Sequence, residues 1–181
     1  VARAYSFAGW EALVRLVSAV EARTPGIYEF EMASEAVIDG DLPALRSLLQ
    51  QHPGLITDRS TRLTSHDPSA PRATLLHYVA ANGVEDYRQR TPANAVEIAR
   101  AILEAGADPN ATAGMYGGEC TTLSMLVSSS HPAGAGVQIA LTELLVDFGA
   151  DPNDRGSGNW TNPVLTALLF GFRDAAETLV R

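Results

Sequence analysis

The chain has 181 residues, of which 46% are apolar and 19% are charged, so it can bury the core of one domain and is not expected to be disordered. Thirteen arginines and no lysine stand against twenty-one acidic residues, and the formal net charge is -8. This charge argues against nucleic acid or an anionic membrane as the main partner, because both attract clustered positive charge. The single cysteine, Cys120, and the lack of an apolar run of membrane-spanning length predict a cytoplasmic protein.

The first predicted element is an amphipathic helix within residues 1–30, with Ser6 as its candidate N-cap. Its apolar positions share one helical face: Trp10, Leu13, Val14, Val17 and Val20. We expect residues 1–30 to form a capping helix and linker that cover the end of a repeat stack. The alternative, a membrane or partner helix, is less favoured because the polar face lacks a basic cluster.

Two later segments repeat one pattern, an apolar pair followed by Gly, Ala, Asp, Pro and Asn, over 102–110 and 145–153. Gly106 and Gly149 can adopt the left-handed conformation that ends a helix, and the proline that follows prevents the helix from resuming. A repeated helix end indicates a repeated structural unit.

Upstream lies the segment Thr-Leu-Leu-His-Tyr-Val-Ala-Ala-Asn-Gly at 74–83. It resembles the ankyrin-repeat signature, with Leu75 in the place of the usual proline. The resemblance covers residues 31–181 and extends to a group of small bacterial ankyrin-repeat proteins with a Trp-bearing leader helix, most of them without an assigned activity. It implies stacked helix pairs with loops on one side, used mainly to bind other proteins. The fold-making positions that transfer are Thr74, His77, Gly83, Gly106 and Gly149.

In this frame, residues 31–181 form one ankyrin-repeat domain with repeats that start near Glu31, Thr74, Thr121 and Asn162. The starts are spaced more widely than the ankyrin period of about 33 residues. The excess falls mainly in two insertions between paired helices, at 84–93 and 128–136. We therefore expect an all-α solenoid of about four helix pairs. The alternative is an ordinary helical bundle. The chain ends inside the last predicted helix, which predicts either a short terminal repeat or a clipped chain.

Several residues permit a chemical interpretation beside a structural one. His77, Cys120 and His131 would be borderline zinc ligands, but no ligand spacing supports a metal site. The glycine-rich segment 113–120 lacks the ending of a phosphate-binding loop and is explained as a loop between repeats. Cys120 has no neighbouring base in the sequence, which favours a structural thiol over a nucleophile. Two glycosylation sequons, at Asn110 and Asn159, are attributed to chance. We expect neither metal nor cofactor.

The insertions carry residue types that dominate protein interfaces. We expect the two insertions to lie side by side and to supply, with their neighbours, a partner or ligand surface: His77, Tyr78, Asn82, Tyr87, Arg88, Arg90, Tyr116, Cys120 and His131.

The leading hypothesis is a non-catalytic scaffold that binds another protein, as a monomer or weak dimer. The second is a small-ligand site or unusual enzyme in a pocket between the insertions. A third is self-association through an exposed terminal repeat, which charge at Leu179 would disrupt.

Overall fold

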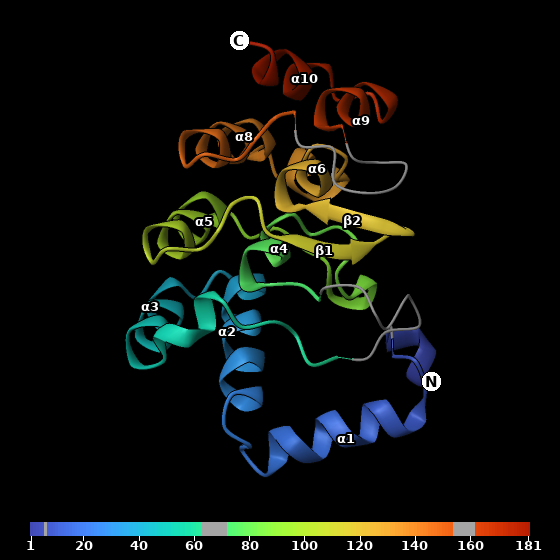
Figure 1. Cartoon of the computed structure of the whole chain (residues 1–181), viewed down its shortest axis with the longest axis vertical. Helices are drawn as coiled ribbons and strands as arrows, with labels where there is room; N and C mark the ends of the chain where they lie inside the picture. The colour runs from blue at the N-terminus through green and yellow to red at the C-terminus, as the bar shows by residue number, and fades with distance from the viewer. Residues whose placement is uncertain (6, 63–71, 154–161) are drawn as a thin grey trace.

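The computed structural model of the chain describes residues 1–5, 7–62, 72–153 and 162–181 (Figure 1). Its elements, in chain order, are η1 (Ala2–Tyr5), α1 (Trp10–Glu21), α2 (Ile27–Asp39), α3 (Leu42–Gln51), η2 (Pro53–Ile56), α4 (Leu75–Val79), η3 (Asp86–Arg88), α5 (Ala95–Glu104), β1 (Thr112–Met115), β2 (Gly118–Thr121), α6 (Thr122–Leu126), α7 (Ser130–Gly134), α8 (Gln138–Asp147), α9 (Pro163–Leu169) and α10 (Arg173–Leu179). The elements written η are 3-10 helices.

The helices from α2 onward pack as two rows (Figure 1). In one row α2 contacts α4, α4 contacts α6 and α6 contacts α9. In the other row α3 contacts α5, α5 contacts α8 and α8 contacts α10. Across the rows, α2 packs on α3, α4 on α5, α6 on α8 and α9 on α10. Successive helix pairs therefore pack against one another.

The predicted all-α fold class is wrong, because the molecule contains a small antiparallel sheet. Strands β1 and β2 pair with Thr112 opposite Thr121 and Met115 opposite Gly118. Tyr116 and Gly117 connect them, with φ values of 53° and 78°. Two successive residues with positive φ are characteristic of the type I′ turn that joins tightly paired strands. The glycine-rich segment that was interpreted as a plain loop is thus a β-hairpin.

Side-chain caps mark the start of several helices. The Thr121 hydroxyl accepts a hydrogen bond from Ser124 N at 3.3 Å at the start of α6. The Asn162 side chain accepts one from Leu165 N at 2.9 Å at the start of α9. Thr74 is the N-cap residue of α4. These positions are the predicted starts of the last three repeats, whereas Glu31, the predicted first start, lies inside α2.

The repeated glycines stand where helices end. Gly106 and Gly149 have φ values of 99° and 93°, in the left-handed region that favours glycine. The asparagine of the first repeated segment then joins the two segments, because Asn110 donates to Gly149 O at 2.8 Å and accepts from Asp151 N at 2.8 Å. The Asn110 side chain therefore serves as a tie between successive helix pairs.

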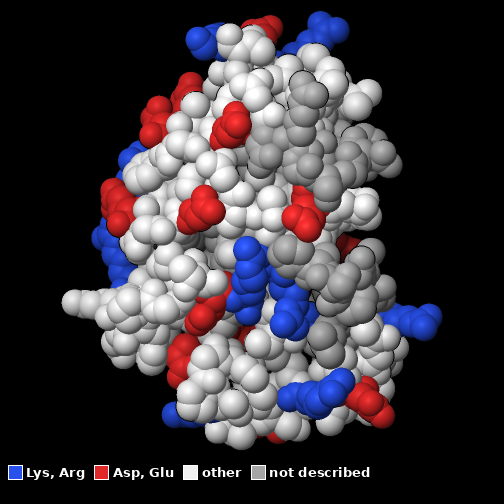
Figure 2. All heavy atoms as spheres, in the orientation of Figure 1, with Lys and Arg blue, Asp and Glu red and all other residues white. Residues whose placement is uncertain are grey.

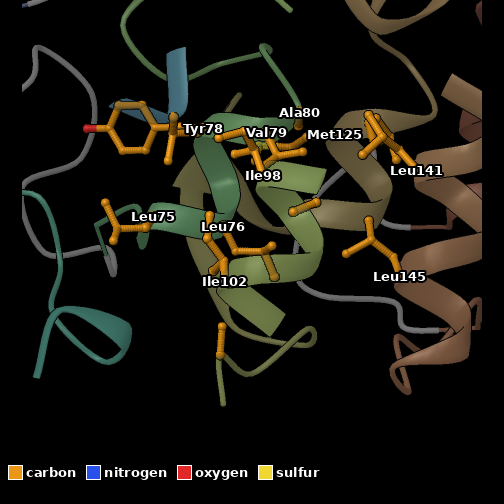
Figure 3. Close-up of a cluster of buried hydrophobic side chains, with 14 of the residues drawn as sticks. Leu75, Leu76, Tyr78, Val79, Ala80, Ile98, Ile102, Met125, Leu141 and Leu145 are labelled. Carbon is orange, nitrogen blue, oxygen red and sulfur yellow. The ribbon is translucent and has the colours of Figure 1, made fainter. Parts of the chain in front are cut away.

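One apolar core runs through the stacked pairs. Leu76, Ile98 and Ile102 are at most 1% exposed and point toward one another between α4 and α5, next to Met125 of α6 (Figure 3). Leu141 and Leu145 of α8 continue the same cluster. The core is therefore continuous along the stack.

The N-terminal helix packs with a different face from the one predicted. Trp10, Val14 and Val17 are 64%, 43% and 45% exposed, whereas Ala12 and Leu16 are buried. The buried face joins a separate small cluster with Phe7 and Ala2, and Leu13, Val20 and Ile27 pack against it in part. The narrow stripe around Ala12 and Leu16 lets α1 approach α2 and η1, which α1 contacts. The prediction for Trp10, Val14 and Val17 is wrong.

Candidate functional site

Three residues of the predicted partner or ligand surface, His77, Tyr78 and Cys120, are buried. His77 is fully buried, and its Nδ1 accepts a hydrogen bond from Thr74 N at 3.1 Å and lies 2.8 Å from Thr74 Oγ1. Burial, followed by the charge of Arg59, lowers the pKa of His77 to about 4, although the carbonyls of Cys120 and Ala111 oppose this shift. The imidazole is therefore neutral at pH 7 and positioned to stabilise the local structure.

Cys120 is a free thiol that is 3% exposed. Burial raises its pKa, although a hydrogen bond with Ser124 acts in the opposite direction. A protonated, enclosed thiol is a poor nucleophile.

His131, the third candidate zinc ligand beside His77 and Cys120, is exposed at the surface. No group of three or more His, Cys, Asp or Glu side chains that could hold a metal ion occurs among the residues that the structure describes.

Four charged side chains from separate segments meet in what we call the charged cluster: Glu31 of α2, Arg62, Glu85 and Arg88 of η3. Arg62 Nη2 lies 2.5 Å from Glu31 Oε2, and Arg62 Nε lies 2.9 Å from Glu85 Oε1. Arg88 pairs with Glu85 through Nε, and its Nη2 is 3.5 Å from Glu31 Oε2. The side chains of these residues are at most 10% exposed. The two acids and two bases alternate, so each buried charge faces opposite charges.

Two tyrosines complete the hydrogen bonding of the charged cluster. The Tyr78 hydroxyl donates to Glu85 Oε1 at 2.5 Å, and Arg62 Nη1 donates to the Tyr87 hydroxyl at 2.8 Å. Burial, followed by the charge of Glu85, raises the pKa of Tyr78 well above its usual value, so the hydroxyl keeps its proton and remains a donor. Glu85 thereby holds partners on α4, on η3 and on the segment of Arg62.

Burial shifts the ionisation of Glu31 as well. Desolvation raises the pKa of Glu31, although the charge of Arg62 and its hydrogen bond with Arg62 oppose the rise. Burial disfavours the charge on Arg62, but Glu85 and Glu31 together raise its pKa. The shifts in these two pKa values have the causes expected of a buried ion-pair network, namely desolvation opposed by the charge of the partner.

The first insertion folds back on the N-terminal half of the molecule. Arg88 Nη1 pairs with Glu35 of α2, and Arg90 pairs with Asp39 at the end of that helix. The Tyr87 ring packs edge-on against Tyr5 with centroids 4.9 Å apart. Residues 84–93 are therefore ordered by α2 and η1.

The second insertion contacts the end of the α4 segment through other residues. Asn82 Nδ2 donates to Met125 O and to Ser128 Oγ, each at 2.9 Å, and Ser129 Oγ donates to Ala81 O at 3.2 Å. A cleft of about 320 Å³ lies beside this insertion, and its other wall is formed by 171–175 at the start of α10. Residues 84–93 do not line this cleft. The cleft is therefore not the predicted pocket between the two insertions.

The β-hairpin projects from the stacked helices (Figure 1). Tyr116 at its turn is 50% exposed, and its hydroxyl donates to Asn82 Oδ1 at 2.5 Å. Gly83 permits this contact, since a Cβ there would lie 3.1 Å from both Met115 Sδ and Tyr116 Cε2. The hairpin is therefore held by strand pairing along its length and, at its turn, by the hydrogen bond between Tyr116 and Asn82.

The face shown in Figure 2 carries both signs of charge, with two neighbouring basic patches near its middle. Arg59 and Arg72 are exposed, and Arg59 Nη1 donates a hydrogen bond to the Thr112 carbonyl at 2.7 Å.

Within the described ranges, no helix is both long and apolar enough to cross a membrane.

No sequence pattern indicates that Glu31, Arg62 and Glu85 belong to one site. Glu31 stands at the predicted start of the first repeat, and Arg62 lies between helices where no periodic pattern applies. Glu85 has a φ of 51°, which is rare for a residue with a side chain. Neither a spacing nor a motif links these residues in the sequence.

Two positions named in the sequence analysis, the candidate N-cap Ser6 and the sequon at Asn159, lie outside the described residues.

A comparison with models of known protein families finds no match for the chain, and a search of curated proteins finds no similar sequence.

Proposed function

We propose that the chain is a non-catalytic protein-binding module of the ankyrin-repeat kind, and that it contacts its partner with the β1–β2 hairpin. The repeated helix ends at Gly106 and Gly149 support the family, together with the Thr74 and His77 pair. Ankyrin repeats bind mainly proteins, with loops that project from stacked helices. A cytoplasmic location belongs to this proposal, and the free, buried Cys120 supports it.

The observation that carries the proposal is a fixed, exposed tyrosine. Tyr116 is half exposed at the tip of a projecting hairpin, where its hydroxyl bonds to Asn82. A side chain held in one position loses little conformational entropy when a partner covers it. Tyrosine is also among the residues that most often dominate binding energy at interfaces. The acidic net charge of -8 favours a partner with a basic surface.

The direct test is site-specific crosslinking in the native host. A photoreactive phenylalanine analogue placed at Tyr116 should give a discrete crosslinked protein, and excess unmodified chain should abolish the product. The matched control carries the analogue at Arg100, an exposed residue of α5. In Figure 1 the helix α5 lies on the opposite side of the stack from the hairpin turn.

A partner isolated in this way should bind Tyr116→Ala at least about tenfold more weakly than the unaltered chain, as expected for a central interface tyrosine. Arg100→Gln should bind normally. Equal crosslinking at both positions, or unchanged affinity of Tyr116→Ala, would remove the hairpin from the proposal.

A further inference from the structure

A cleft of about 240 Å³ lies between α1 and the extended segments on either side of the undescribed residues 63–71. We call it the Arg15 cleft, and its lining residues are Ala12, Arg15, Leu16, Ala19, Ile27, Thr61 and Arg72. Helix α1 crosses below the rest of the molecule (Figure 1). The cleft therefore belongs to the N-terminal end and is separate from the hairpin.

The floor of the Arg15 cleft is apolar for a reason that can be read from α1. Ala12, Leu16 and Ala19 have the i, i+4, i+7 spacing of one helical face. Ile27, the first residue of α2, is partly buried beside this face. The two alanines leave room that longer side chains would fill, so an apolar hollow remains where α1 meets its neighbours.

Two exposed arginines, Arg15 and Arg72, also line the cleft. Arg15 has no carboxylate within ion-pair distance among the described residues, and the same is true of Arg72. The guanidinium of Arg72 makes one long hydrogen bond, from Nη1 to Thr61 O at 3.4 Å. Arg62, Arg88 and Arg90, in contrast, all pair with acids. In a chain with a net charge of -8, these are two exposed arginines on one hollow that have no ion pair among the described residues.

We propose that the Arg15 cleft binds a small aliphatic carboxylate. The alkyl chain would lie on Ala12, Leu16 and Ala19, where it leaves water. The carboxylate would lie between the guanidiniums of Arg15 and Arg72, whose planar N–H groups match its two oxygens. An apolar floor with a few polar groups that fix orientation is the usual composition of a small-molecule site. This inference does not depend on the protein-binding proposal.

The test uses hexanoate as the probe, with two matched compounds that each lack one half of it. In titrations followed by NMR of the full chain, hexanoate should saturate the shifts of α1 amides with a Kd of about 1 mM or below. Acetate has the carboxylate without the chain, and 1-hexanol has the chain without the charge. Both should bind at least about tenfold more weakly.

Variants then assign the two halves of the cleft. Arg15→Gln and Arg72→Gln should each weaken hexanoate about threefold to tenfold, because these exposed ion pairs contribute modestly. Ala19→Leu should fill the floor and abolish saturation, and Arg100→Gln on α5 should leave hexanoate binding unchanged. Urea unfolding of each variant verifies that it is folded.

The proposal is overturned if hexanoate fails to saturate the α1 shifts, or if 1-hexanol binds as tightly as hexanoate. It is also overturned if both arginine variants bind hexanoate normally. These results leave the hairpin proposal unaffected, because that proposal concerns Tyr116 and is tested by crosslinking.

Discussion

The helix stack and the N-terminal end of this molecule are held together by different interactions. From α2 to α10 one continuous apolar core joins successive helix pairs, and many of its side chains are fully buried. The N-terminal helix has only a small cluster around Phe7 and Leu16, which borders an open cleft. Next to it, the charged cluster links α2 with the first insertion. Apolar contacts between successive helix pairs thus stabilise the stack, whereas buried ion pairs stabilise its first helix, α2.

This difference has a consequence for how each region responds to change. Removing apolar atoms from the stack leaves a cavity between two helix pairs, which cannot close without moving both. Removing one charge from the cluster leaves its opposite charges buried without a partner. Loss of core packing is expected to destabilise the protein at any helix pair of the stack. Loss of a charge is expected to have this effect at the charged cluster.

The largest effect is expected at the centre of the charged cluster. Glu85→Gln keeps the shape of the side chain but removes the negative charge that faces Arg62, Arg88 and Tyr78. We expect a loss of about 3–5 kcal/mol in the free energy of unfolding, measured with urea at pH 7. Glu97→Gln on the exposed face of α5 is the control and should change stability by less than about 0.5 kcal/mol. A loss below about 1 kcal/mol for Glu85→Gln would mean that the cluster is solvated.

The two apolar regions can be compared with one substitution made twice. Leu145→Ala removes a fully buried side chain from the stack core and should lower the free energy of unfolding by about 3–4 kcal/mol. Leu16→Ala removes a side chain that is 9% exposed beside the Arg15 cleft, and a loss of about 2 kcal/mol is expected. Urea unfolding of both variants measures the difference. Equal losses would show that the N-terminal end is as tightly packed as the stack.

The features that sequence analysis predicted are those with local causes. Thr74, Thr121 and Asn162 were placed at repeat starts, and each is the N-cap of a helix in the structure. Gly106 and Gly149 follow helix ends with positive φ. Caps and helix ends are decided by a few neighbouring residues, so their signals can be read from one segment at a time.

What the sequence could not provide depends on distant partners or on an unusual backbone. Glu31, Arg62 and Glu85 meet only after three segments have folded together. The hairpin was missed because Tyr116 has a φ of 53° in a turn that usually carries Asn, Asp or Gly. The prediction for α1 failed because Trp10 and Val14 have the right spacing for burial, yet both side chains are exposed in the structure.

The stack should also respond to pH through His77. Its pKa is lowered to about 4 in the folded chain, against 6.5 for an unperturbed histidine, so the unfolded chain takes up a proton first as the pH falls. Stability from the neutral imidazole is therefore complete above pH 6.5 and is lost as the pH falls toward 4. Between pH 7.5 and 5.0 we expect a loss of about 2 kcal/mol in urea unfolding.

His77→Gln isolates this contribution, because glutamine does not titrate. The variant will be less stable at pH 7.5, but its stability should fall by about 2 kcal/mol less between pH 7.5 and 5.0 than that of the unaltered chain. Glu31 is present in both chains, and its raised pKa acts in the opposite direction, so the difference between the chains removes it. Parallel pH profiles would contradict the role assigned to His77.

The smallest effect concerns the hairpin, whose shape rests on backbone conformation instead of burial. Gly117 has a φ of 78°, and a Cβ added there would meet no atom within 4 Å. Gly117→Ala should therefore cost about 1 kcal/mol through the left-handed conformation alone, without any steric clash. Thermal unfolding followed by circular dichroism measures the loss.

Gly134 offers the matched control, because it also has open space around it but ends the helix α7 with no positive φ. Gly134→Ala should leave the free energy of unfolding unchanged or raise it by up to about 1 kcal/mol, since alanine restricts the unfolded chain and favours helix. Opposite signs for the two glycines would establish that the turn at Tyr116 and Gly117 is a conformational requirement of the chain. A neutral result at Gly117 would mean that the hairpin turn relaxes to another form, and that Tyr116 is not held where a partner could use it.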